Sequence, residues 1–181
     1  MKPIRRMTQA ELAAFVQTHL LQRGIHVVLS GGASVAFYSD NAYVSKDVDL
    51  VNIYSARGSA IESVMEEIGF REEGRYFKHP ESEVFVEFPP GPLAVGAEPV
   101  QSVDETSLAT GTLRIISPTD CVKDRLASYY HWGDRQALTQ ALLVAEHRPI
   151  DLREVARWSK VEGKQEEFRR IRSSLISARI E

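Results

Sequence analysis

Asp47 and Asp49 have the residue types and the spacing of a metal site. They bracket Val48 inside an apolar run. Residues two apart in a β-strand point to the same face at a spacing of about 6.5 Å, so both carboxylates can reach one divalent ion while Val48 and Leu50 face a core. Carboxylate oxygens are ligands that Mg²⁺ prefers. The pair therefore predicts a site for Mg²⁺ or Mn²⁺.

Gly31 and Gly32 end an earlier apolar run, and 14 residues separate Gly32 from Asp47. Without side chains, glycines let the backbone approach a ligand closely and leave N–H groups free for phosphate oxygens, above all where a helix begins. Ser34, like Ser30 and Ser45, can donate a hydroxyl to phosphate, although each also suits a turn or a helix. This segment predicts a triphosphate site beside the metal.

The combined pattern resembles the DNA polymerase β-type nucleotidyltransferase superfamily. A glycine pair, a short helix and an Asp-x-Asp strand follow one another, and the spacing and the stretch Ser45–Leu50 are similar to the abortive-infection, AbiEii-type branch. The core pattern covers about residues 25 to 90, and residues 117 to 134 resemble the helical part of uncharacterised members. The resemblance implies transfer of a nucleoside monophosphate from an NTP, ATP among them, with carboxylates that hold two metal ions about 4 Å apart.

A third carboxylate usually completes the triad in this superfamily, on a strand beside the Asp-x-Asp strand. Glu87 lies between Val86 and Phe88 and fits that apolar-acid-apolar pattern. We therefore expect Glu87 to join Asp47 and Asp49 as a catalytic and metal-binding residue. The alternative is that Glu87 lies on a solvent-exposed strand face.

The resemblance also implies two nucleotide-binding residues after residue 117. In relatives, a lysine from the first helix of the C-terminal region reaches the triphosphate, and Lys123 holds the comparable place. Asp124 can instead neutralise Lys123 or Arg125 in a surface pair. Asp134 resembles an aspartate that shapes the site in AbiEii-type proteins, but it also suits a helix N-cap.

The periodicity of apolar residues predicts an α+β fold, with a nucleotidyltransferase-like mixed β-sheet flanked by helices and an all-helical C-terminal region. We expect a core domain over residues 1–117 and a helical region over 118–181 that packs on it. The expected helices are 8–23, 33–38, 58–68, 118–132, 134–147, 151–161 and 164–177, and the expected strands are 25–29, 47–53, 75–79, 84–88 and 111–116. Residues 89–108 are expected to form a loop.

Composition excludes several classes of protein. The 181 residues carry a net charge of −3, which argues against a strongly basic nucleic-acid binder. No run approaches 18 apolar residues, so we expect no membrane segment and a cytoplasmic location. The single cysteine, Cys121, rules out an internal disulfide and a cysteine-rich zinc cluster.

The sequence leaves three functions open. The first is metal-dependent transfer of a nucleoside monophosphate to an acceptor hydroxyl, with RNA favoured over protein or a small molecule because Arg169, Arg170 and Arg172 lie in a net-positive C-terminal segment. The same arginines also suit a solvated helix face. The second is a nucleotide- or partner-binding protein without turnover, for instance with a cognate toxin or antitoxin. The third is a small-molecule resistance enzyme of the aminoglycoside type.

Overall fold

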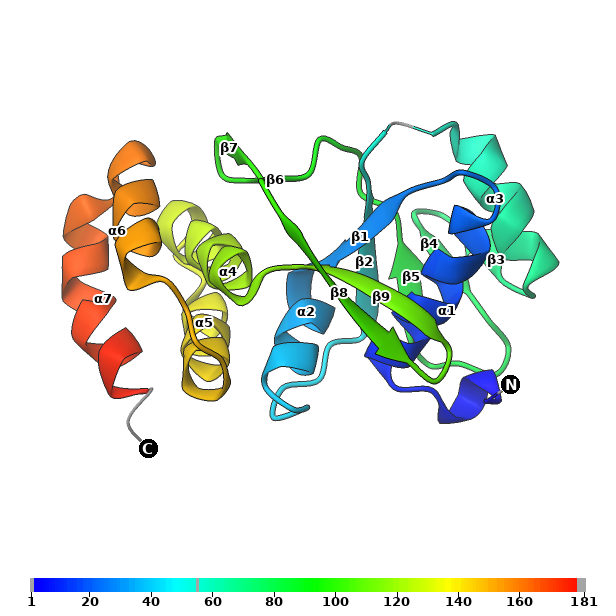
Figure 1. Ribbon diagram of the computed structural model, residues 1–181, viewed down its shortest axis with the longest axis horizontal. Coiled ribbons are helices and arrows are strands. Elements are labelled where there is room, and N and C mark those ends of the chain that lie inside the picture. Colours follow the sequence, from blue (N-terminus) through cyan, green and yellow to red (C-terminus); the bar gives the residue numbers. More distant parts are fainter. Residues whose placement is uncertain (1, 55, 179–181) are drawn as a thin grey trace. The chain divides into compact units, whose positions relative to one another are not determined.

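The structure is a computed structural model that describes residues 2–54 and 56–178 (Figure 1). The chain divides into two compact units. The sheet unit comprises Met1–Ser34, Val44–Leu93 and Gln101–Ile116, and the helical unit comprises Val35–Tyr43, Ala94–Val100 and Ser117–Glu181. Helix α2 (Gly31–Tyr38) begins in the sheet unit and continues into the helical unit.

Seven strands form the sheet of the sheet unit, in the order β3-β4-β5-β2-β1-β9-β8. β2 runs parallel to β5 and β1 parallel to β9, whereas the remaining neighbours are antiparallel, so the predicted mixed sheet is confirmed. The strands are β1 (Val27–Ser30), β2 (Asp47–Asn52), β3 (Arg71–Glu73), β4 (Tyr76–Lys78), β5 (Phe85–Glu87), β8 (Val103–Leu108) and β9 (Gly111–Ile116).

Two helices, α1 (Gln9–Leu21) and α3 (Gly58–Glu67), pack together, and α1 also packs against β1, β2 and β9. A capping box between Thr8 and Glu11 starts α1, which lies within the helix predicted over residues 8–23. The apolar side of α1 is buried, and a short 3₁₀-helix, Ile4–Arg6, precedes it. Because strand side chains alternate, Val48 and Leu50, which are fully buried, leave Asp47 and Asp49 on the other face of the sheet.

Four helices and a two-stranded ribbon form most of the helical unit (Figure 1). They are α4 (Pro118–Trp132), α5 (Arg135–His147), α6 (Leu152–Val161), α7 (Gln165–Ser177), β6 (Ala94–Val95) and β7 (Glu98–Pro99). The fully buried Trp158 stacks on Tyr130 with ring centroids 5.9 Å apart, and its indole Nε1 donates to the Val95 carbonyl oxygen. Trp158 thus joins α6 to α4 and to the ribbon.

The sequence prediction misses the two edge strands of the sheet, β3 and β8. Both lie in segments expected to be irregular, and both carry several charged or polar side chains that are mostly exposed. Alternation of apolar and polar residues marks a strand only when one face is buried, and polar edge strands lack that mark. The sheet is therefore two strands wider than the sequence predicts. In the described part of the chain, no helix is long and apolar enough to cross a membrane.

Ion pairs of α6 make the stability of the helical unit depend on pH. Hydrogen bonds from Arg157 and Lys123 lower the pKa of Glu154 from 4.5 to about 2. A carboxyl group whose pKa falls on folding adds stability above pH 4.5 and loses it as the pH falls toward 2. Glu154→Gln should therefore lower the free energy of unfolding near neutral pH by on the order of 1 kcal/mol.

Denaturant titrations at several pH values test this expectation, and the difference between variant and wild type should shrink in acid. The matched control is Glu166→Gln, which removes a carboxylate whose ion pair with Arg169 is exposed on both sides and should change little. If Glu154→Gln is as much less stable than wild type in acid as it is at neutral pH, the ion pairs of the Glu154 carboxylate are not the cause of the loss.

Candidate metal and nucleotide site

The sheet brings Asp47, Asp49 and Glu87 together. β2 and β5 pair in parallel with Asp49 opposite Glu87, and alternation places Asp47 on the same face. One carboxylate oxygen from each of the three side chains lies within 4.8 Å of the others, and all three side chains are half-buried. The arrangement can present three oxygen ligands to one or more cations.

Gly31 lies directly beside this cluster. β1 and β2 pair with Ser30 opposite Asp49, so the residue after Ser30 meets the Asp49 side chain. Gly31 has φ +64°, and a Cβ atom built there would lie 2.1 Å from Asp49 Oδ2. Only glycine fits both the backbone conformation and the space. The backbone of Gly31 thus lies close to the carboxylates, as expected from the sequence pattern if this segment binds phosphate.

Helix α2 begins at the glycine pair, so the first N–H groups of α2 have no partner within the helix. Such groups favour anions. Ser34 is fully buried, and its Oγ donates to the Gly31 carbonyl oxygen at 2.7 Å, which supports the turn. The binding of nucleotide by Gly31, Gly32 and Ser34 stays a prediction.

A hydrogen-bond chain that the sequence does not reveal orients Asp47. Ser45 Oγ donates to Asp47 Oδ1 at 2.6 Å, and the side-chain amide of Gln9 donates to the Ser45 carbonyl oxygen at 2.5 Å. Gln9 comes from α1, and its Oε1 is buried with no hydrogen-bond partner among residues 2–54 and 56–178. The apolar packing of α1 thus also helps to fix a site residue. The sequence leaves Ser45 either a phosphate contact or a place in a turn, and in the structure its hydroxyl donates to Asp47.

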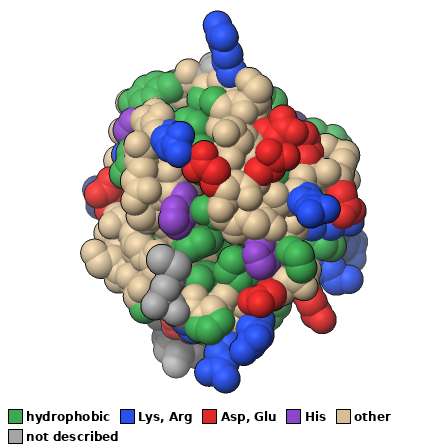
Figure 2. Space-filling view, turned by 90° about the vertical axis from the view of Figure 1, so that its right-hand side faces the viewer, with side chains coloured by type: hydrophobic (Ala, Val, Ile, Leu, Met, Phe, Trp, Pro, Cys, Tyr) green, Lys and Arg blue, Asp and Glu red, His purple; other side chains and the backbone are tan. Residues whose placement is uncertain are grey.

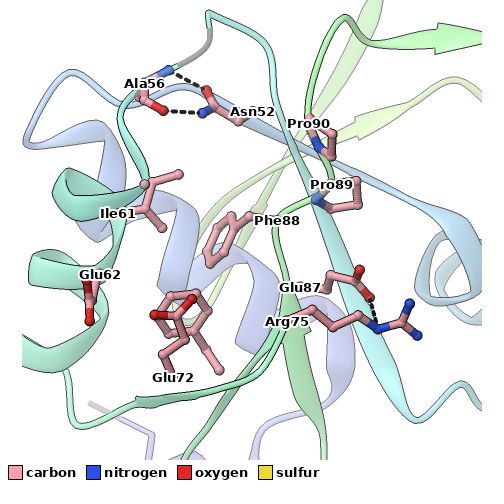
Figure 3. Close-up of a pocket in the computed structure, with 12 residues that line it drawn as sticks. Asn52, Ala56, Ile61, Glu62, Glu72, Arg75, Glu87, Phe88, Pro89 and Pro90 are labelled. Atoms are coloured by element: carbon pink, nitrogen blue, oxygen red, sulfur yellow. Dashed lines mark hydrogen bonds and ion pairs between the residues drawn. The ribbon is translucent and has the colours of Figure 1, made fainter.

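Arg75 pairs with the third carboxylate. Its Nε lies 3.6 Å from Glu87 Oε2, and its guanidinium group donates to the Tyr76 hydroxyl and lies 4.7 Å from the centroid of that ring. Figure 3 shows Glu87 and Arg75 on the opposite side of β5 from Phe88 and Ile61. The sequence prediction begins a strand at Arg75 and misses β3, so it gives no reason to expect Arg75 in a turn beside Glu87.

A pocket of about 430 Å³ adjoins Glu87 and extends toward α3. Its apolar wall includes Ile61, Phe77 and Phe88, and Glu62 and Glu72 add carboxylates (Figure 3). A neighbouring hollow of about 930 Å³ shares Glu62 and Glu72. The lining of the 430 Å³ pocket includes Glu87 but neither Asp47 nor Asp49, so this pocket offers room for an organic group beside one member of the carboxylate cluster.

No protein-family model and no curated protein sequence matches the chain. Solved structures do. A nucleotidyltransferase-like antigenic protein from Paracoccidioides brasiliensis superposes with a TM-score of 0.60 at 15% identity, covering 92% of this chain and 91% of that one. A crystal structure of ANT(2'')-Ia in complex with adenylyl-2''-tobramycin gives 0.53 at 18%, covering 90% and 98%. The solution structure of the antibiotic-resistance factor ANT(2'')-Ia gives 0.52 at 16%, covering 93% and 95%.

The chain has a nucleotidyltransferase-like fold. The predicted fold class is thereby confirmed, whereas membership of the superfamily and of its AbiEii-type branch stays a prediction. At these identities the likeness establishes the fold alone, so the chemistry has to be argued from the residues themselves.

The remaining predicted residues, Lys123 and Asp134, lie in the helical unit. Lys123 is buried, and its Nζ pairs with Asp120 at 2.7 Å and with Glu154 at 3.1 Å. Asp124 pairs with Arg125 instead. Asp134 caps α5 by accepting from the N–H groups of Gln136 and Ala137. These structural contacts account for both residues, and their roles in nucleotide binding stay predictions.

The carboxylate cluster of this nucleotidyltransferase-like fold suits a divalent cation. Three carboxylates so close together repel one another, and hard oxygen ligands match Mg²⁺ or Mn²⁺. A Cβ at Gly31 would fill the space that the Asp49 carboxylate occupies within the cluster. The described residues thus fit the cofactor that the sequence predicts, although they do not distinguish the two ions.

Replacement of Gly31 tests the close approach. Gly31→Ala should lower the free energy of unfolding by about 1–2 kcal/mol, because an L side chain is strained at this φ, and should weaken Mn²⁺ binding because Asp49 has to move. Gly58→Ala is the matched control, since Gly58 lies in a helix with nothing within 4 Å of its Cβ position. Thermal unfolding and calorimetric Mn²⁺ titration measure both effects. Unchanged binding in Gly31→Ala would show that the ion lies elsewhere.

Replacement of Asp47 tests the cation site itself. Asp47→Asn should abolish calorimetrically detectable Mn²⁺ binding and leave the protein at least as stable as wild type, since the change removes a charge from a mutually repelling cluster. Asparagine retains an oxygen that can accept from Ser45. The control is Glu72→Gln, which removes the same charge from an exposed position of β3 outside the cluster. Equal Mn²⁺ affinity in Asp47→Asn and wild type would refute the site.

Proposed function

We propose that the protein is a Mg²⁺-dependent nucleotidyltransferase that moves a nucleoside monophosphate from an NTP to an acceptor hydroxyl. The observation that carries the proposal is the convergence of Asp47, Asp49 and Glu87 beside the backbone of Gly31. This cluster combines a cation site with a surface where polyphosphate can approach without a side chain in the way. The nucleotidyltransferase-like fold supports it.

In this proposal Asp47, Asp49 and Glu87 hold the metal, Mg²⁺ or Mn²⁺. The bound ions supply Lewis-acid stabilisation of charge on the reacting oxygens. Backbone N–H groups of Gly31 and Gly32 stabilise the negative charge of the phosphates. Lys123, Ser34 and Asp134 are the further nucleotide-binding residues proposed from the sequence.

The reaction joins the acceptor oxygen to the α-phosphorus and breaks the bond between that phosphorus and the bridging oxygen of the β-phosphate. Pyrophosphate leaves with the electron pair of the broken bond. The acceptor hydroxyl gives its proton to Glu87, which passes it to solvent. Glu87 suits this step because its side chain is 21% exposed at the edge of the cluster, where an acceptor can reach it.

Incubation with each α-labelled NTP and Mg²⁺, together with total RNA, cell protein or a mixture of hydroxylated amines, identifies the class of reaction. Label should enter one acceptor fraction with the wild-type protein and none with Asp47→Asn. Absence of label from every fraction would refute the enzyme proposal and favour a protein that binds nucleotide or a partner without turnover. The toxin–antitoxin setting stays a prediction from the sequence.

RNA is the acceptor proposed from the sequence, on the basis of the arginines of α7. Arg169, Arg170 and Arg172 changed together to alanine should reduce transfer to RNA at low salt more than at high salt, because each lost phosphate contact also lowers the salt dependence. In the structure Arg169 pairs with Glu166 at 2.5 Å, so a matched double variant with only Arg170 and Arg172 changed should show most of the effect. Label in protein alone would overturn the RNA assignment.

A small cationic molecule with a hydroxyl group is the second candidate acceptor. The specific observation is the pocket beside Glu87, in which the carboxylates of Glu62 and Glu72 adjoin an apolar wall. Figure 2 shows acidic side chains gathered on one part of a face of the molecule. One solved relative of the fold, ANT(2'')-Ia, is seen with adenylyl-2''-tobramycin. Label that enters only the amine fraction, and falls when Glu62 and Glu72 are changed to glutamine, would select this acceptor over RNA.

A further inference from the structure

Arg75 reaches the carboxylate cluster from a turn that otherwise serves only to connect two strands. Gly74 and Arg75 join β3 to β4, with Gly74 at φ +67°. Tyr76, the first residue of β4, pairs with Glu87 of β5, so its neighbour Arg75 lies within reach of the Glu87 side chain. Figure 3 shows the Arg75 side chain crossing to Glu87.

The contact between Arg75 and Glu87 is loose. At 3.6 Å the Nε–Oε2 separation is an ion pair and not a hydrogen bond, and the Arg75 side chain is 69% exposed. The guanidinium group is held more closely by the Tyr76 hydroxyl and ring. Arg75 can therefore leave Glu87 without leaving Tyr76.

Arg75 and a divalent ion need the same carboxylate. The oxygens of Asp47, Asp49 and Glu87 that lie within 4.8 Å of one another are those that would hold the ion. Positive charge from Arg75 offsets part of their repulsion, but a metal that takes Glu87 removes the need for it. The exposed guanidinium group would then be beside the cation site without its carboxylate partner.

We propose that Arg75 is a displaceable counter-ion of the carboxylate cluster, which pairs with Glu87 in the metal-free protein and with the polyphosphate of the nucleotide once metal is bound. The planar guanidinium group suits both partners, since it bonds carboxylate and phosphate oxygens in the same way. Arg75 thereby exchanges one anion for another as the site fills. This inference rests on the proposed function and adds a substrate-binding residue to it.

The first measurement is calorimetric titration with Mn²⁺ alone. Arg75→Ala should bind Mn²⁺ about two- to fivefold more tightly than wild type, the range expected when an exposed ion pair no longer competes. Arg75→Lys keeps the charge and should stay near wild type. The matched control is Arg71→Ala, which removes a positive charge from an exposed position of the same strand pair, and Arg71 makes no ion pair with the cluster among the described residues.

The second measurement uses inorganic triphosphate with saturating Mn²⁺, a probe that is independent of the nucleobase. Arg75→Ala should bind it several-fold more weakly than wild type, and Arg71→Ala should not. Thermal unfolding with and without Mn²⁺ verifies that each variant is folded. In Arg75→Ala the affinity for Mn²⁺ thus rises while the affinity for triphosphate falls. A general loss of structure or of charge would not change the two affinities in opposite directions.

Each other outcome overturns the proposal. Unchanged or weaker Mn²⁺ binding in Arg75→Ala would show that Arg75 does not compete with metal, and unchanged triphosphate binding would show that it does not bind phosphate. Equal effects in Arg71→Ala would show that Arg75 acts through long-range charge and not through its contact with Glu87. Failure of the proposed function gives a different result. The wild-type protein would then either not bind Mn²⁺ or bind it as tightly as Asp47→Asn does.

Discussion

The parallel pairing of β2 with β5 places like charges next to each other, and the site depends on this register. Asp49 lies opposite Glu87 because Val48 and Val86, one residue earlier on each strand, are opposite one another and fully buried. A slip of one residue would turn these apolar side chains to solvent and the carboxylates into the core. Burial of the apolar face thus supplies the free energy that holds three mutually repelling groups together.

Neighbouring groups fit this cluster in different ways. Gly31 gives the Asp49 carboxylate space, Ser45 gives Asp47 a hydrogen bond, and Arg75 gives Glu87 a positive charge. Gln9 of α1 holds Ser45 in place by donating a hydrogen bond to its carbonyl oxygen, whereas Arg75 reaches the cluster from an exposed turn. Gly31 and Ser45 are buried, whereas Arg75 is exposed, so the contact with Glu87 is the most accessible of the three.

The helical unit has an internal organisation of its own. Trp158 joins α6 to α4 and the β6–β7 ribbon, and Lys123 lies buried between the carboxylates of Asp120 and Glu154.

Solved structures with the same fold include a complex with adenylyl-2''-tobramycin. The fold by itself does not determine function, because function depends on side chains around the site and not on the path of the backbone.

Local features of the sequence determined the long helices, the central strands and the glycine and aspartate motifs. Apolar periodicity, the Thr8 capping box and the stop at Gly133 act within a few residues and can be read directly. They also placed Glu87 on a strand, whereas its position beside Asp47 was expected from the resemblance to the nucleotidyltransferase superfamily. Only the tertiary structure revealed the polar edge strands β3 and β8, which lack a buried face. It alone decided that Arg75 meets Glu87, because this contact depends on strand pairing across the sheet and leaves no pattern in the sequence.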